Sequence, residues 1–140
     1  MINHIKLDLT KLSNQLIMKT YSFEKLDAWQ EARRLAVKIY KLTRQFPEKE
    51  KFGLVSQMRR CSISISSNIA EGTSRSTAKD QIRFYEIAYG SLMELLNQAI
   101  ISADLEMLLA ENLVDIRLDI DSIAHKLTRL TQSQRNKEGR

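Results

Sequence analysis

The side chains in this sequence that are able to carry out covalent chemistry are few and far apart. The chain has one cysteine, Cys61, and two histidines, His4 and His125. A catalytic thiol needs a histidine close to it in space, and both histidines lie far from Cys61 along the sequence. Cys61 instead falls in an apolar helical pattern, which is typical of a buried free thiol. We therefore expect no nucleophilic active site.

A metal centre is not expected either. Metal sites inside helical bundles use inward-facing carboxylates together with Glu-x-x-His pairs. Neither histidine has a glutamate three residues before it, because Ser122 precedes His125 and Met1 precedes His4 at that distance. The sequence thus predicts no metal, no cofactor, no small-molecule substrate and no enzymatic activity.

A set of polar residues is open to two interpretations, an active-site cluster or a structural network. Arg60, Ser64, Asn68 and Glu71 are separated by four, four and three residues, so they share one face of a helix. Buried Asn or Arg–Glu pairs commonly fix register and oligomeric state in helical assemblies. We favour the structural interpretation, and the predicted network comprises Arg60, Ser64, Asn68, Glu71, Arg83 and Glu94.

Positive charge is concentrated in the first half of the chain. Residues 1–76 hold 14 Lys and Arg against 7 Asp and Glu, whereas residues 77–140 hold 8 against 10. The segment 33–60 alone has nine basic and two acidic residues. A surface of this kind attracts phosphate groups. The residues predicted to contact nucleic acid are Arg33, Arg34, Lys38, Lys41, Arg44, Lys49, Lys51 and Arg59.

Three uses of this charge remain open: ordinary solvated helix faces, binding to nucleic acid, and binding to a protein with no nucleic-acid role. The sequence has no helix-turn-helix, zinc-finger or ribonucleoprotein signature. Any contact with RNA or DNA should therefore be made to the backbone and should weaken with salt. The leading interpretation is a non-catalytic nucleic-acid-binding or scaffold protein, and the alternative is a protein-binding adaptor.

The composition favours one domain built from a few long helices. Of 140 residues, 43% are hydrophobic, while only one is proline and four are glycine. Such a chain can bury a core but has few turn-forming residues. We expect an N-terminal extension over 1–20, frayed or forming a short extra helix, then a bundle domain over 21–132 and a disordered polar tail over 133–140.

Apolar residues recur at spacings of three and four, which predicts helices. Pro47 should end the first helix, Gly72 should end the second as a C-terminal cap, and Thr77 or Ser76 should cap the third, with Asp80 in its first turn. Residues 62–67 alternate with the period of a strand, but they lie within a longer helical pattern, so we assign them to a helix. The predicted helices span 25–46, 54–72, 77–106 and 110–132.

Short connections between four helices predict an antiparallel up-down-up-down four-helix bundle. A three-helix core with the helix over 25–46 outside it is the weaker alternative. No segment has the length of a membrane span without charges, and the N-terminus lacks the features of a signal peptide. We therefore expect a cytoplasmic protein with no membrane partner.

Several motifs in the first three predicted helices resemble those of one protein family. The motifs are Phe23-x-x-Leu26-x-x-Trp29-Gln30-x-Ala32, Phe52-Gly53-Leu54-x-Ser56-Gln57-Met58-Arg59-Arg60, Ser67-Asn68-Ile69-Ala70-Glu71-Gly72, Arg83-Phe84 and Gly90-Ser91-Leu92-x-Glu94-Leu95. Together they cover about residues 21–105, and they resemble bacterial four-helix-bundle proteins encoded in intervening sequences of 23S rRNA genes.

That family is similar to the accessory proteins of diversity-generating retroelements, which form five-fold barrels and bind a reverse transcriptase and nucleic acid. The resemblance implies a ring-like homo-oligomer here, a homopentamer. One position departs from the family pattern: Ser66 stands where a proline is frequent, so any kink caused by that proline should be softened.

Overall fold

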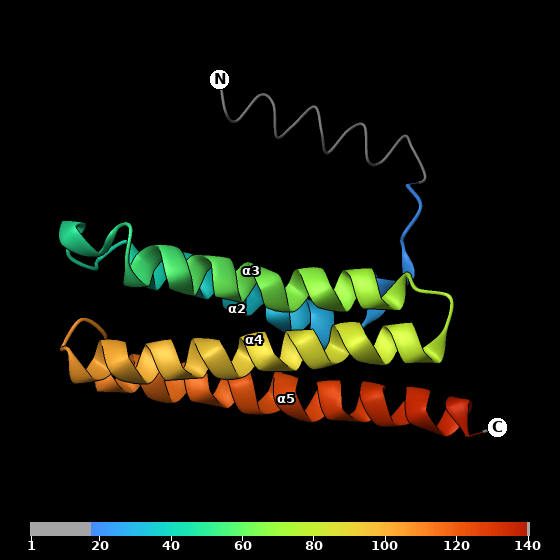
Figure 1. The fold of residues 1–140 in the computed structure, drawn as a ribbon. Helices are drawn as coiled ribbons and strands as arrows, with labels where there is room; N and C mark the ends of the chain where they lie inside the picture. The colour runs from blue at the N-terminus through green and yellow to red at the C-terminus, as the bar shows by residue number, and fades with distance from the viewer. Residues whose placement is uncertain (1–17, 140) are drawn as a thin grey trace.

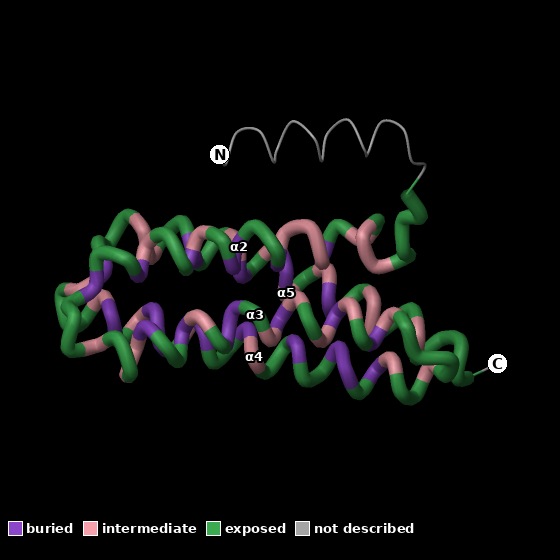
Figure 2. The backbone as a smooth tube through the Cα atoms, turned by 90° about the horizontal axis from the view of Figure 1, so that it is seen from above, coloured by how far each residue is buried: buried purple, intermediate pink, exposed green. Residues whose placement is uncertain are grey.

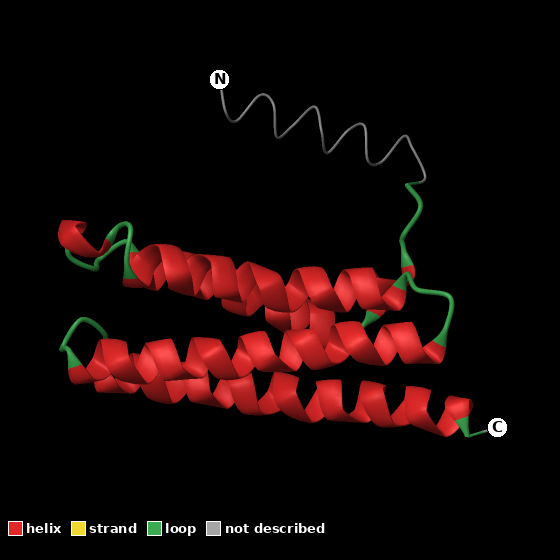
Figure 3. Cartoon of the chain, viewed as in Figure 1, coloured by secondary structure: helices red, strands yellow, loops and turns green. Residues whose placement is uncertain are grey.

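The structure is a computed structural model that describes residues 18–139, and within that range it contains helices and no strands (Figures 1 and 3). Residues 1–17 of the extension predicted over 1–20 lie outside the described residues. No helix between residues 18 and 139 has a stretch apolar and long enough to cross a bilayer. The elements are η1 (Ser22–Lys25), α2 (Asp27–Thr43), η2 (Glu48–Glu50), α3 (Leu54–Thr73), α4 (Ala78–Asp104) and α5 (Ala110–Glu138).

The four long helices form the predicted all-α antiparallel bundle. Helix α3 packs against α2 and α4, and α5 packs against α4 and α2, so the helices follow one another around a shared core. Buried positions recur along each helix toward the interior (Figure 2). The largest fully buried side chains are Leu35, Ile39, Met58, Ile65, Ile69, Tyr85, Leu92, Leu95, Ile116, Ile120, Ile123 and Leu127.

Helix α3 includes the stretch 62–67 that alternates like a strand. Ser62 and Ile65 are buried, as the three-residue helical spacing requires. The Ser62 hydroxyl donates to the Arg59 carbonyl at 2.8 Å, and the Ser66 hydroxyl donates to the Ile63 carbonyl at 3.2 Å. Because serine side chains satisfy their own hydrogen bonds on the helix backbone, the helix accommodates this polar segment inside a bundle. The helical assignment is confirmed.

Gly72 does not cap α3 in the way we predicted. No glycine in the described chain has a positive φ, and α3 continues to Thr73. A Cβ placed on Gly72 would lie 2.8 Å from the Cβ of Phe84 and 3.1 Å from the Tyr85 ring. Gly72 is therefore required by the close approach of α3 and α4. Of the two caps predicted for the next helix, Thr77 is the one the structure shows, since its hydroxyl accepts the Asp80 N–H at 3.2 Å.

The ends of the other helices differ modestly from prediction. Helix α2 ends at Thr43, and the chain then turns so that Phe46 is still buried before Pro47. Helix α5 continues to Glu138, so the segment from 133 predicted to be disordered is helical as far as that residue. The Arg135 guanidinium contacts the Glu86 carboxylate of α4 at 2.9 Å, which ties this polar end of α5 to the bundle.

Candidate nucleic-acid interface

Helix α2 carries four of the eight residues predicted to bind nucleic acid, and a fifth, Arg44, follows its last residue. Its core side is lined by Ala28, Ala32, Leu35 and Ile39, all buried. Helical geometry turns the remaining positions outward. Arg33, Arg34, Lys41 and Arg44 are accordingly exposed.

Lys38, which was predicted to contact nucleic acid, forms ion pairs with α5. Its ammonium lies 2.7 Å from a carboxylate oxygen of Asp115 and 2.5 Å from one of Asp119, both on α5. Burial alone would lower the pKa of Lys38, but hydrogen bonds to the two carboxylates and their negative charges outweigh it and raise the pKa. Lys38 therefore joins α2 to α5, and its charge is balanced within the chain.

Lys49 and Lys51 lie in the connection between α2 and α3, at one end of the bundle (Figure 1). Both are exposed, and they alternate with Glu48 and Glu50, so this connection has no net charge from these four residues. The Lys51 ammonium lies 5.7 Å from the centre of the Phe52 ring, which is itself 89% exposed. The two lysines add donors at the bundle tip without making it strongly positive.

Arg59 reaches across from α3 to α2 and is held there by several contacts. Its guanidinium lies 4.7 Å from the centre of the Tyr40 ring. Its Nε donates to the Thr43 hydroxyl at 3.0 Å, and a terminal nitrogen donates to the Tyr40 carbonyl at 3.3 Å. These contacts fix the position of the positive charge at the α2–α3 surface.

Sequence reasoning missed the aromatic side chains that accompany these cations. Arg33 lies over the ring of Trp29 at 5.4 Å, and Trp29 in turn contacts the edge of Phe23 with 4.9 Å between ring centres. The four-residue spacing of Trp29 and Arg33 was a usable local signal. The pairing of Tyr40 with Arg59 had no such signal, because it depends on how α2 and α3 align.

The six residues of the predicted polar network are not joined in one hydrogen-bonded set. Ser64 and Asn68 do meet: the Asn68 amide donates to the Ser64 hydroxyl at 3.1 Å, and that hydroxyl lies 2.9 Å from the Ser91 hydroxyl on α4. The others have separate partners. Arg60 bonds Gln57, Glu71 pairs with Arg75, Arg83 lies over Phe84, and Glu94 accepts from Gln98.

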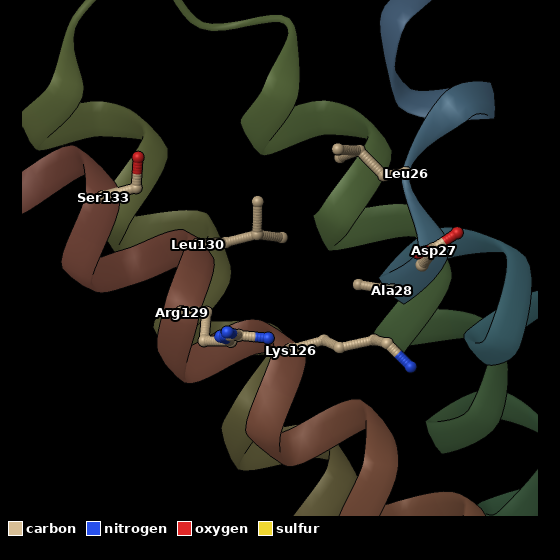
Figure 4. A pocket seen from close by; sticks show the side chains of 7 residues that line it. All are labelled: Leu26, Asp27, Ala28, Lys126, Arg129, Leu130 and Ser133. Atoms are coloured by element: carbon tan, nitrogen blue, oxygen red, sulfur yellow. The ribbon is translucent and has the colours of Figure 1, made fainter.

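A pocket of about 320 Å³ opens between the N-terminus of α2 and the second half of α5. Leu26 and Leu130 point toward its interior from opposite walls, and Lys126 and Arg129 lie along the α5 side (Figure 4). The Lys126 ammonium is already paired with Glu31 at 2.5 Å. Among residues 18–139, no three His, Cys, Asp or Glu side chains are grouped in a way suited to a metal ion.

Comparison with known proteins agrees with this architecture. No curated protein matches the chain. The sequence model of the family described as 23S rRNA-intervening sequence protein matches residues 24–129, which include α2, α3, α4 and most of α5. That match covers well over half of the chain, and it coincides with the four-helix bundle. The chain therefore belongs to the 23S rRNA-intervening sequence protein family.

Proposed function

We propose that this protein is a non-catalytic nucleic-acid-binding protein of the cytoplasm that contacts RNA or DNA phosphates through the outer surface of α2 and the adjoining part of α3. We call this surface the basic face; it comprises Arg33, Arg34, Lys41, Arg44 and Arg59. The family is named for intervening sequences of 23S rRNA, which supports a role alongside RNA.

The observation that carries this proposal is the unpaired state of the basic face. Among residues 18–139, Lys38 alone of the eight predicted contact residues forms an ion pair within the chain. The remaining cations keep their charge available at the surface. Acidic residues gather elsewhere: residues 94–121 hold seven Asp and Glu against one Arg. A polyanion should thus be attracted to the basic face and repelled by the exposed acidic residues of this segment.

Binding of this kind should depend strongly on salt, because each neutralised phosphate releases condensed counterions. It should carry little base specificity when the contacts are to phosphates alone. The affinity for RNA and for DNA of the same length should then be similar at low salt and should fall together as salt rises.

The test is charge reversal on the basic face with a matched control. The variant Arg33→Glu, Arg34→Glu, Lys41→Glu changes the net charge by six, and so does the control Lys79→Glu, Arg117→Glu, Lys137→Glu on α4 and α5. All six residues are exposed, and none has an ion pair in the described chain. Affinity for a 30-nucleotide RNA is measured by fluorescence anisotropy at two salt concentrations.

We expect the first triple variant to bind at least tenfold more weakly than the control, with a salt slope reduced by about 2 for three lost phosphate contacts. Equal losses in both variants would show that total charge matters and the basic face does not. Absence of binding by the unaltered protein at low salt would reject the proposal.

We further propose that copies of the chain associate into a ring-like homo-oligomer, a pentamer. The support from the structure is the apolar surface that a single chain leaves exposed, including Ile63 on α3 and Ile87 and Ile101 on α4. Light scattering of the purified protein gives its mass directly. A mass of five chains is expected, and a mass of one chain would reject assembly.

A protein-binding adaptor is the second candidate function, and one observation favours it. Val114 and Leu118 on α5 are 58% and 63% exposed, and Glu111, Asp115 and Asp121 lie within a turn of them on the same helix. An exposed apolar patch with an acidic rim is typical of a protein-interaction surface. If this is the main function, charge reversal on the basic face should leave partner binding unchanged.

A further inference from the structure

Two pairs of an arginine and an aromatic residue lie along the same side of α2. Arg33 covers Trp29, and Arg59 from α3 covers Tyr40. Trp29, Arg33, Tyr40 and Arg44 are separated by four, seven and four residues, each close to a whole number of helical turns. The four side chains therefore project from one flank of α2, the flank that faces α3.

Both pairs remain accessible at the surface. Tyr40 is 37% exposed, and Trp29 and Arg59 are only partly buried. Val37 lies between the two pairs along α2 and is also exposed. This flank therefore presents flat and apolar groups together with positive charge, whereas a surface that recognises phosphates alone needs only the charge.

The Arg59 guanidinium is held in place before any ligand arrives. Hydrogen bonds to the Thr43 hydroxyl and the Tyr40 carbonyl orient it over the Tyr40 ring. An arginine fixed in this way loses less conformational entropy on binding than a freely rotating side chain. Because its delocalised plane can stack on a nucleobase, Arg59 is suited to contact a base as well as a phosphate.

We infer that this flank binds single-stranded nucleic acid by stacking unpaired bases on the Trp29–Arg33 and Tyr40–Arg59 pairs. The inference rests on the proposed function and narrows its ligand class. Bases within a duplex are stacked on one another and expose only their edges, so these pairs have nothing to stack on in a duplex. Unpaired bases have free faces, and stacking on aromatic or guanidinium planes tolerates any sequence.

The spacing of the two pairs fits a ligand that spans several nucleotides. Tyr40 follows Trp29 by 11 residues, which is about 16 Å along a helix that rises about 1.5 Å per residue. Successive stacked bases are separated by about 3.4 Å in one strand. The two pairs therefore contact different bases of the same strand, and Arg44 at the end of the row is positioned to contact a phosphate beyond them.

The experiment compares ligands and variants that keep the charge. Fluorescence anisotropy is measured with a 20-nucleotide oligouridylate, a 20-nucleotide oligothymidylate and a 20-base-pair DNA duplex. Arg59→Lys retains the positive charge but loses the guanidinium plane, and Arg117→Lys makes the same exchange on α5, outside the basic face. Tyr40→Leu removes the aromatic ring, and Tyr40→Trp restores one.

We expect both single strands to bind more tightly than the duplex. Arg59→Lys and Tyr40→Leu should each weaken single-strand binding about tenfold and leave duplex binding unchanged, while Arg117→Lys should have no effect. Tyr40→Trp should bind at least as well as the unaltered protein. Circular dichroism and thermal melting of each variant establish that the bundle remains folded.

Failure of this inference is distinguishable from failure of the proposed function. If single strands and duplex bind equally, and Arg59→Lys behaves like Arg117→Lys, stacking is rejected while phosphate binding stands. If no nucleic acid binds at low salt, the proposed function is rejected and this inference with it.

Discussion

Different kinds of contact join α3 to α4 and α2 to α5. The α3–α4 interface is closed by small side chains, and the α2–α5 interface is bridged by charged ones. Each interface joins two antiparallel helices of one bundle. The contrast between them therefore shows which contacts determine the fold and which contacts depend on pH and salt.

At the α3–α4 interface the helices approach closely along their length. Gly72 lies against Phe84 and Tyr85, the Ser64 and Ser91 hydroxyls are 2.9 Å apart, and the Cys61 thiol donates to the Ser91 carbonyl at 2.9 Å. Small side chains let the helix backbones approach and bring many atoms into van der Waals contact. The stability of this interface should depend little on pH or salt.

At the α2–α5 interface the partly exposed rim is occupied by charges. Lys38 pairs with Asp115 and Asp119, and Lys126 pairs with Glu31. The Ser122 hydroxyl donates to Glu31 at 2.5 Å. Toward the N-terminus of α2 the interface opens into the pocket lined by Leu26 and Leu130. Ion pairs of this exposure contribute little to stability and are weakened by salt.

The comparison shows that charged residues on one helix differ in whether a neighbouring helix neutralises them. Charges that face α5 are neutralised by α5, as with Lys38. Charges on the outer side and on the α3 side of α2, such as Arg34 and Arg33, are left without ion pairs. Two acidic residues of α5, Asp115 and Asp119, thus neutralise Lys38, while the other cations of α2 keep no ion pair in the described chain.

The largest effect we predict concerns the thiol at the α3–α4 interface. Burial, assisted by the nearby negative charge of Glu94, raises the pKa of Cys61 from its ordinary 9.0 to about 12. At pH 8 the reactive thiolate is then about a thousandfold scarcer than for an ordinary thiol. Labelling with a thiol reagent should be correspondingly slow in the folded protein and fast in guanidinium chloride. Glu94→Gln should accelerate it, and labelling of the folded protein at the rate of a free thiol would contradict a closed interface.

The second prediction compares two glycines. Gly72→Ala places a Cβ 2.8 Å from the Cβ of Phe84, which cannot rotate away. The helices must separate, and we expect a loss of about 2 kcal/mol in the free energy of unfolding. Gly90→Ala on α4 meets nothing within 4 Å and should gain about 0.5–1 kcal/mol from helix propensity.

Urea unfolding of both variants measures the difference. A gain in both would show that α3 and α4 are less tightly packed than the structure indicates, and a loss in both would show that Gly90 has a role that a single chain does not reveal.

Features set by local sequence were predictable. The periodicity of apolar residues gave the four helices, and Thr77 with Asp80 gave the start of α4, because a cap depends on residues three apart. The extent of α5 was underestimated because residues after 132 have no apolar pattern. Their helix is supported by good helix formers such as Gln134 and Lys137 and by the contact of Arg135 with Glu86.

Features set by the alignment of helices were not predictable in the same way. Gly72 was assigned to a cap because glycine commonly ends helices, whereas its actual role depends on Phe84 lying opposite. Lys38 was counted among nucleic-acid contacts, although its partners are 77 and 81 residues away in the sequence. The Arg59–Tyr40 pair similarly requires the register between α2 and α3. For the candidate interface, therefore, the sequence supplied the charge but not the arrangement of the aromatic rings.

The smallest effect we predict is a pH dependence located at the α2–α5 interface. Burial alone would raise the pKa of Glu31, but hydrogen bonds from Lys126 and Ser122 and the positive charge of Lys126 outweigh it, so the pKa lies below its ordinary 4.5. The unfolded chain then binds a proton more readily than the folded one. Stability from Glu31 is present above pH 4.5 and is lost as pH falls through the lower folded pKa.

Because the Lys126 side chain is 35% exposed, solvent screening limits this contribution to about 1 kcal/mol or less. Urea unfolding at pH 7 and at pH 3 should show a smaller pH-dependent loss in Glu31→Gln than in the unaltered protein. Glu86→Gln is the matched control, because Glu86 pairs with Arg135 across α4 and α5 where both side chains are more than half exposed. If the two variants change the pH dependence equally, the charged bridge between α2 and α5 is no more than an ordinary surface ion pair, and the contrast between the two interfaces rests on packing alone.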